Sequence, residues 1–145
     1  CGCGEEPYSL ALALAEDGVP PGLVRIEAAD LCPASVRRAE AGRYPAFAFR
    51  EAGADPRPRY FRDAGAGRWE LDARVRDGVR FRTANLVSSD FLAGEMPFDL
   101  ILCRNLFIYL TDEARTWAVA NLRRLLTPNG RLCLTPAEAD RLPPG

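Results

Sequence analysis

The stretch CGCGEEPYSLA, residues 1–11, places a glycine-bearing turn directly before the start of a helix. Glu5 and Glu6 follow the turn, and Pro7 falls in the first helical turn, where its missing N–H costs nothing. Such a turn is typical of loops that hold a nucleotide-type cofactor at the carboxyl edge of a parallel sheet. Because only Gly2 and Gly4 are present, and not a full G-x-G-x-x-G, the turn alone is a weak signal.

Length and composition indicate one globular domain. The chain has 145 residues, of which 48% are hydrophobic, enough for a buried core. Its formal net charge of -1 gives no electrostatic reason to expect nucleic acid or a membrane surface as a partner. No apolar run approaches the length that a bilayer needs, and no signal-peptide pattern is found, so we expect a cytoplasmic protein without membrane insertion.

The five cysteines favour free thiols over a metal site or a disulfide framework. Cys1 and Cys3 form C-x-C rather than C-x-x-C, and the sequence contains no histidine. A structural zinc site would need four well-spaced ligands. An odd number of cysteines also argues against a set of disulfides, so we expect no metal and reduced thiols.

Periodicity predicts an α/β fold with a mostly parallel sheet. We expect helices over residues 6–16, 33–41 and 112–126. We expect strands over residues 23–28, 79–82, 98–103 and 131–135. Gly42 should end the second helix and Thr111 should cap the third. The continuous apolar run over 98–103 predicts a strand buried on both faces, and residues 127–130 predict a turn.

The pattern breaks down between residues 43 and 77, where prolines and glycines interrupt it. Here we expect short helices and a small antiparallel piece that pairs residues 68–71 with residues 73–76.

Polar or glycine features follow the predicted strands. They are the loop of residues 2–5, Asp30, Asn85 and Arg104-Asn105. Ligands of open parallel sheets bind at the carboxyl ends of the strands, and an acid about two dozen residues after a glycine loop is the usual ribose ligand. Taken alone, Asp30 fits an ordinary helix-capping acid better. The features together favour a cofactor site.

Motifs along nearly the whole chain resemble those of one family. They are GEEPYS at 4–9, AEAGRY at 39–44, RYF at 59–61, VRF at 79–81 followed by Asn85-Leu86, and FDLILCRNLFIYL at 98–110. The last contains C-R-N-x-x-I-Y, which is rarely seen elsewhere. The chain thus resembles the CheR family of S-adenosylmethionine-dependent methyltransferases, which methylate glutamates of bacterial chemoreceptors.

The resemblance implies a Rossmann-like class I methyltransferase sheet with helices on both faces. Residues 1–145 would form part of that domain, with a small antiparallel β-subdomain inserted at about residues 57–78. The first central strand, the terminal strand pair and the family's amino-terminal helical domain are expected to lie outside this sequence. The short loop at residues 65–67 predicts no binding of a receptor-tail peptide.

The resemblance also implies which residues hold the cofactor, S-adenosylmethionine. Gly2, Cys3, Gly4 and Glu5 would form the loop, with Glu5 against the methionine portion. Asp30 would bind the ribose hydroxyls. The adenine would lie against Asn85, followed by Leu86.

The floor of the implied pocket would carry the catalytic residues. Arg104, Asn105 and Tyr109 would line it, with Arg104 and Tyr109 nearest the methyl group and the incoming glutamate. The alternative for Tyr109 is a core aromatic. Cys103 is expected to be a packed core thiol rather than a nucleophile.

The implied activity is that of a protein-glutamate O-methyltransferase, which forms glutamate methyl esters and S-adenosylhomocysteine on the cytoplasmic domain of a chemoreceptor. A glutamate with a pKa of about 4.3 is already ionised near neutral pH, so no general base is needed. Catalysis would rest on alignment and desolvation.

Departures from the family pattern favour an alternative, a catalytically inactive CheR-like module that binds the cofactor for regulation. Cys3 stands where the family usually has Thr. Cys32 stands where the family has the second acid of a D-x-D motif, of which Asp30 is the first. After the last strand the family has a glycine and then S-E, whereas this chain has Thr135-Pro136-Ala137-Glu138, of which only Glu138 matches. A third alternative is a different Rossmann methyltransferase or a dinucleotide oxidoreductase, and the lack of a full glycine fingerprint argues against the oxidoreductase.

Overall fold

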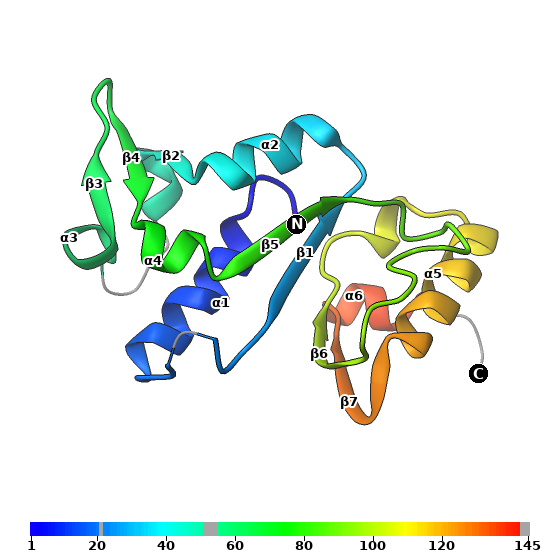
Figure 1. Cartoon of the computed structure of the whole chain (residues 1–145). Coiled ribbons are helices and arrows are strands. Elements are labelled where there is room, and N and C mark those ends of the chain that lie inside the picture. The colour runs from blue at the N-terminus through cyan, green and yellow to red at the C-terminus, as the bar shows by residue number, and fades with distance from the viewer. Residues whose placement is uncertain (21, 51–54, 143–145) are drawn as a thin grey trace. The chain divides into compact units, whose positions relative to one another are not determined.

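The computed structural model describes residues 1–20, 22–50 and 55–142, and confirms the predicted α/β class (Figure 1). The helices are α1 (Glu5–Glu16), α2 (Pro33–Ala41), α3 (Arg57–Tyr60), α4 (Ala73–Arg76), α5 (Asp112–Arg124) and α6 (Pro136–Ala139), with 3-10 turns η1 (Ala46–Phe49) and η2 (Phe107–Tyr109). The strands are β1 (Ile26–Asp30), β2 (Arg43–Pro45), β3 (Phe61–Asp63), β4 (Arg68–Leu71), β5 (Val79–Thr83), β6 (Phe98–Leu102) and β7 (Leu126–Cys133).

These strands form small sheets rather than one large one. Among the described residues, β1 pairs with β5 in parallel, β2, β4 and β3 form an antiparallel sheet, and β6 pairs with β7 in parallel. The chain divides into two compact units, residues 1–83 and residues 84–145.

The core of unit 1 gathers around Tyr8 of α1. Tyr8 is 2% exposed, and its ring centroid lies 5.3 Å from that of Phe81 on β5 and 6.3 Å from that of Tyr44 on β2. Ala28 of β1 and Leu71 of β4 are buried in the same cluster. The parallel β1–β5 pair and the antiparallel sheet therefore share one hydrophobic core within this unit.

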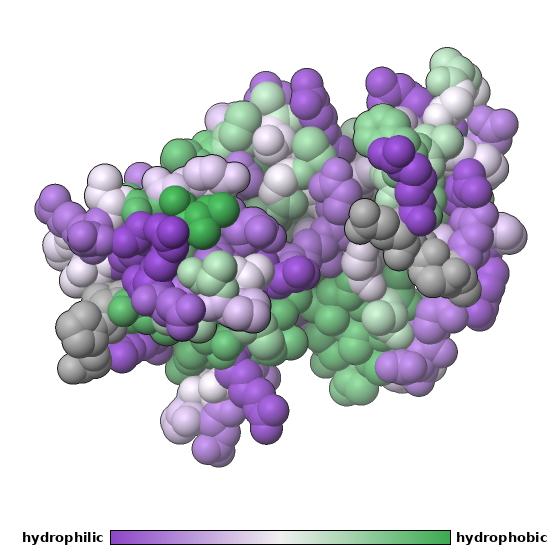
Figure 2. Space-filling view, turned by 180° about the vertical axis from the view of Figure 1, so that it is seen from behind, coloured by the Kyte–Doolittle hydropathy of each residue, from purple (hydrophilic) through white to green (hydrophobic). Residues whose placement is uncertain are grey.

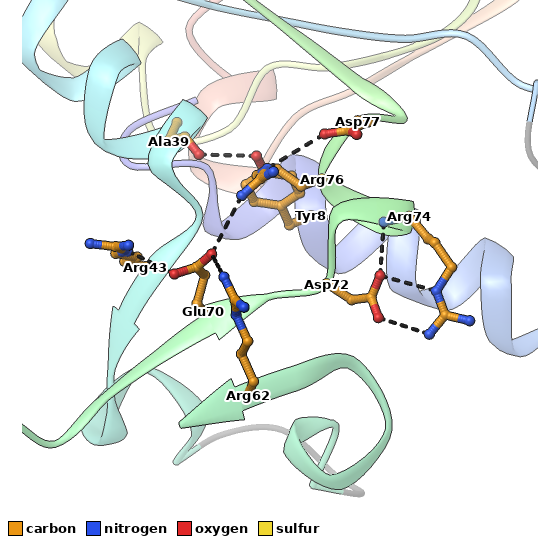
Figure 3. Close-up of polar contacts among 9 residues, drawn as sticks. All are labelled: Tyr8, Ala39, Arg43, Arg62, Glu70, Asp72, Arg74, Arg76 and Asp77. Atoms are coloured by element: carbon orange, nitrogen blue, oxygen red, sulfur yellow. Dashed lines mark hydrogen bonds and ion pairs between the residues drawn. The ribbon is translucent and has the colours of Figure 1, made fainter. Parts of the chain in front are cut away.

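Glu70 sits at the centre of the antiparallel sheet (Figure 3). It is directly opposite Arg43 on β2 and Arg62 on β3, and its carboxylate accepts hydrogen bonds from both, at 2.9 Å and 2.5 Å. Arg76 of α4 lies 3.7 Å away. The hydrogen bond from Arg62 lowers the pKa of Glu70. Burial of the carboxylate acts in the opposite direction but does not outweigh it.

Two expectations for unit 1 are corrected. Residues 73–76 form helix α4 rather than a strand, because Asp72 caps them by accepting the Arg74 N–H at 2.8 Å. The antiparallel partners of β4 are instead β2 and β3. The strand expected over 23–28 begins only at Ile26 and runs on to Asp30.

Unit 2 packs α5 against the β6–β7 pair. Thr111 caps α5 as predicted, accepting the Ala114 N–H at 3.3 Å. Ala118 and Leu122 of α5 are buried together with Phe107, which is fully buried, and with the thiol of Cys103, a core residue as expected. α5 ends at Arg124 rather than residue 126.

The apolar run over residues 98–103 predicted a strand buried on both faces. This prediction is wrong, because β6 is only partly buried. Asp99 is exposed and Leu100 is 44% exposed. Within the described residues β6 has one neighbouring strand, so one edge and part of its surface stay uncovered. Figure 2 shows, on the face that it draws, apolar residues gathered in patches among polar ones.

The turn predicted at residues 127–130 is instead a bulge within β7. Phe98 pairs with Leu126 and Leu100 pairs with Arg131, so the register shifts between them. The chain returns to β6 at Gly130, where an added Cβ would lie 2.9 Å from the Phe98 carbonyl oxygen. Glycine is thus required here by close backbone approach rather than by a turn conformation.

We predict that Gly130→Ala lowers the free energy of unfolding by about 1–3 kcal/mol, because the new methyl group meets rigid backbone. Chemical denaturation measures the change. Asn129→Ala is the control, since Asn129 is exposed in the same bulge and its loss should cost less than about 0.5 kcal/mol. Equal stability of the two variants would contradict the close approach.

Candidate functional site

The glycine loop before α1 is shaped by two tyrosines. Gly4 is buried with a φ of +91°, and an added Cβ would lie 2.9 Å from the Tyr44 hydroxyl oxygen and 3.0 Å from the Ala39 Cβ. The Tyr44 hydroxyl donates to the Cys3 carbonyl oxygen at 2.8 Å, and the Tyr8 hydroxyl donates to the Ala39 carbonyl oxygen at 3.0 Å. The loop is therefore fixed through its backbone, at a position where only glycine fits.

Asp30, at the carboxyl end of β1, ties this loop to the strand. Its Oδ2 accepts the Gly2 N–H at 2.9 Å, and its Oδ1 accepts the Cys32 N–H at 2.9 Å. Burial acts to raise the pKa of Asp30, but the hydrogen bonds from Cys32 and Gly2, together with the charge and hydrogen bond of the Cys1 amino group, hold the pKa below its usual value. Asp30 is thus an ionised acceptor that connects the glycine loop, through Gly2, to the residue before α2, Cys32.

Glu5 stands beside the same loop. It is exposed in the first turn of α1, and its Oε2 is 3.8 Å from where a Gly2 Cβ would lie. The structure therefore brings together Gly2, Cys3, Gly4, Glu5 and Asp30 in unit 1.

In unit 2, a buried amide holds the turn that carries Asn85. The Asn85 side-chain oxygen accepts the Val87 N–H at 3.2 Å, which closes a local turn. Asn121 of α5, 5% exposed, donates from Nδ2 to the Leu86 carbonyl oxygen at 2.7 Å and to the Ser88 carbonyl oxygen at 2.8 Å. Asn85 itself is exposed, and Leu86 packs against the unit's core.

The loop after β6 presents the other predicted residues of unit 2. Arg104 and Asn105 are exposed, and Asn105 has a φ of +58°. Tyr109 is 78% exposed, so it is not a core aromatic. Phe107, between them, is the residue that the core buries.

The prediction of site residues missed the role of Glu138. Its carboxylate is completely buried and accepts N–H groups of Asn105 (3.0 Å), Leu106 (2.6 Å) and Phe107 (2.9 Å). The N–H and hydroxyl of Thr135 donate to it at 3.1 Å and 2.5 Å. The sequence offered one signal, the match of Glu138 to the family's S-E position, but nothing in it pointed to residues more than thirty positions away.

Burial acts to raise the pKa of Glu138, but hydrogen bonds from Thr135, Asn105 and Leu106 outweigh it and lower the pKa to about 2. The carboxylate is therefore ionised at any pH at which the protein would work.

The described residues contain neither a membrane-spanning helix nor a metal-binding cluster of side chains. None of their helices has the length and apolarity to cross a membrane. In the same parts of the chain no cluster of three or more His, Cys, Asp or Glu side chains could hold a metal ion.

Comparison with known proteins identifies the family. The model of the CheR methyltransferase SAM-binding domain matches residues 1–141. The chain therefore belongs to the CheR methyltransferase family, and S-adenosylmethionine is the cofactor of the matched domain.

Named relatives agree with this match. A probable biofilm formation methyltransferase, WspC of Pseudomonas aeruginosa, is 39% identical over 142 residues, which cover 98% of this chain and 33% of the relative. Chemotaxis protein methyltransferase 1 of the same species is 35% identical, over 96% of this chain and 52% of the relative. A chemotaxis protein methyltransferase of Vibrio parahaemolyticus is 36% identical, over 94% of this chain and 50% of the relative. The chain thus spans about a third to a half of the length of these curated relatives.

The residues of unit 1 fit this cofactor in chemical type. An ionised carboxylate accepts hydrogen bonds from hydroxyl groups. Asp30 Oδ2 already accepts the Gly2 N–H and the amino group of Cys1, whereas Oδ1, which accepts the Cys32 N–H, has a lone pair left for a ligand hydroxyl. The packing of Tyr44, Ala39 and Tyr8 around Gly4 leaves no room for a side chain in the turn.

We predict that Gly4→Ala destabilises unit 1 by about 2 kcal/mol and weakens binding of S-adenosylhomocysteine, because it adds crowding to a positive φ. Thermal unfolding and calorimetric titration measure the two effects. Gly18→Ala is the matched control, since Gly18 has a φ of +74° with nothing within 4 Å. If both variants lose the same stability and both bind as the parent does, the tyrosine-packed loop is not a constraint.

We predict that Glu138 makes stability depend on pH in acid. Its pKa falls from 4.5 to about 2 on folding, so its contribution is complete above about pH 4.5 and is lost as the pH falls towards 2. Denaturation at several pH values should show the stability gap between the parent and Glu138→Gln shrinking over that range. The exposed Asp140, at the end of α6, supplies the control Asp140→Asn, for which the gap should stay small at every pH.

Proposed function

We propose that the protein containing this chain is an S-adenosylmethionine-dependent methyltransferase that forms methyl esters on glutamate side chains of chemoreceptor cytoplasmic domains. The observation that carries the proposal is the Asp30 carboxylate, ionised at the end of β1 and bonded to the glycine loop. The family match and the names of the relatives, which refer to chemotaxis and biofilm formation, support it.

We further propose that the whole chain, residues 1–145, is one methyltransferase domain built on a Rossmann-like sheet with helices on both faces. The β1–β5 and β6–β7 pairs are parallel, as that sheet requires. Within the described residues, β1 pairs with β5 alone and β6 pairs with β7 alone. The segment at about 57–78, which contains β3 and β4, would be the inserted β-subdomain.

Cofactor binding is assigned to residues at the predicted positions. Backbone atoms of Gly2, Cys3 and Gly4 would approach the ligand, with Glu5 against its methionine portion and Asp30 holding its ribose hydroxyls. The adenine would lie against Asn85 and Leu86. Arg104 and Asn105 are also assigned to cofactor binding.

When bound, S-adenosylmethionine supplies an electrophilic methyl group, which a glutamate carboxylate oxygen can take while the carbon–sulfur bond breaks and its electron pair stays on sulfur. Arg104 would attract and orient the substrate carboxylate, and the exposed Tyr109 would position it by hydrogen bonding. Because that carboxylate is already ionised, the protein need hold no base. Arg104 must orient without neutralising the nucleophile.

The setting of this reaction would be the cytoplasm, with the chemoreceptor as a protein substrate and no binding of a receptor-tail peptide. A second candidate is a catalytically inactive module that binds S-adenosylmethionine or S-adenosylhomocysteine. It is favoured by Cys3, because a thiol in place of the family's Thr is a poorer hydrogen-bond donor to a ligand.

We predict that Asp30→Asn weakens S-adenosylhomocysteine binding by about 10–100-fold, because hydrogen bonds to a charged acceptor are worth about 1.5–3 kcal/mol. Calorimetric titration of the full-length protein measures it. Asp63→Asn is the control, because the side chain of Asp63 is exposed and accepts the Gly65 N–H in a turn outside the glycine loop. Transfer of labelled methyl groups to receptor glutamates then separates the two candidates. Tight binding without transfer would favour the regulatory module, and unaltered binding by Asp30→Asn would remove the assigned ribose site.

A further inference from the structure

The backbone N–H groups of the loop after β6 need a hydrogen-bond acceptor from outside the loop. Asn105 is left-handed, with a φ of +58°, and the N–H groups of Asn105, Leu106 and Phe107 all converge on one carboxylate. Successive N–H groups that converge in this way form a concavity suited to an anion. Here the protein supplies that anion itself, from Glu138 of α6.

The acceptor is matched to its donors in number and charge. Glu138 Oε1 receives Leu106 and Phe107, and Oε2 receives Asn105 together with the N–H and hydroxyl of Thr135. Both oxygens are thus needed as acceptors. A glutamine would turn its NH₂ group towards N–H donors on one side, and an aspartate is one methylene shorter.

The two ends of the loop are held differently. Phe107 is fully buried in the core, and its carbonyl oxygen accepts a hydrogen bond from Arg115 Nε at 3.1 Å. Arg104 and Asn105 are exposed, and the Asn105 N–H goes to Glu138. Loss of the carboxylate should therefore leave the Phe107 side chain in place and loosen the backbone at Asn105.

We propose that Glu138 is a positioning residue for methyl transfer, which acts by fixing the backbone of the loop that presents Arg104 and Asn105. This rests on the proposed function, in which these two residues meet the cofactor and the substrate carboxylate. Glu138 itself is buried and touches neither.

The test compares Glu138→Gln with Leu125→Ala in the full-length protein. Leu125 is 2% exposed, and its carbonyl oxygen accepts the Phe98 N–H at the opposite end of β6 from Arg104, so its truncation destabilises the same unit without touching the loop. The measurements are kcat and KM for methyl transfer, S-adenosylhomocysteine affinity and amide hydrogen exchange at residues 105–107, all at a temperature where both variants are folded.

Glu138→Gln is expected to lower kcat about 100-fold, as misplacement of catalytic groups by about 1 Å does, and to speed exchange at residues 105–107. Leu125→Ala should keep kcat within about threefold. If Glu138→Gln keeps the parent's kcat, or if both variants lose kcat in proportion to stability, the proposal is overturned.

A milder variant covers the case in which Glu138→Gln does not fold. Thr135→Val removes one of the donors to Oε2 and should lower kcat several-fold with faster exchange at Asn105. Unchanged kcat and exchange in Thr135→Val would then overturn the proposal.

Failure of the proposed function is distinguishable from failure of this inference. If the parent binds S-adenosylhomocysteine but methylates no glutamate, the proposed activity is wrong. Faster exchange at residues 105–107 with weaker ligand binding in Glu138→Gln would still support positioning of the loop, and unchanged values of both would overturn it.

Discussion

A carboxylate that accepts backbone N–H groups is the interaction on which the candidate site depends in each unit. In unit 1, Asp30 joins β1 to the glycine loop through Gly2. In unit 2, Glu138 joins α6 to the loop after β6. Each bond lets a short irregular segment keep one conformation, because an ionised acceptor is worth more to an N–H group than a neutral one.

Other buried side chains pack beneath these loops and form hydrogen bonds with the backbone. The rings of Tyr8 and Tyr44 fill the space under the glycine loop while their hydroxyls satisfy backbone carbonyl groups. Burial raises the pKa of Tyr8 to about 12, so it stays a neutral donor. In unit 2, Asn121 has the equivalent task of joining a helix to the Asn85 turn.

Elements with local signals could be predicted from the sequence. Helix α2 begins at Pro33 and ends before Gly42, whose φ of +58° suits glycine, and Thr111 caps α5 as expected. The motif at residues 98–110 pointed to the loop after β6 and, by family resemblance, to the cofactor that the family match supports.

Elements that depend on distant residues could not be predicted in this way. Residues 73–76 are an exception, because their alternation of apolar and charged residues favours a strand while the cap that makes them helical comes from the neighbouring Asp72. The bulge in β7 forms because Gly130 approaches β6, and the apolar run over β6 gave no sign that Leu100 would be exposed. Glu138 matched a position of the family motif, but its hydrogen bonds could not be predicted, because its partners lie more than thirty residues earlier in the chain.

The arrangement around Glu70 has a consequence for how the antiparallel sheet assembles. Side chains alternate between faces along a strand, so a shift of β2 or β3 by one residue would turn Arg43 or Arg62 away from the buried carboxylate. A shift by two would leave that carboxylate facing the wrong residue. Either shift would cost the buried carboxylate one of its arginine partners, with Arg76 of α4 remaining 3.7 Å away, so the arginine–glutamate–arginine row favours one alignment of these three very short strands.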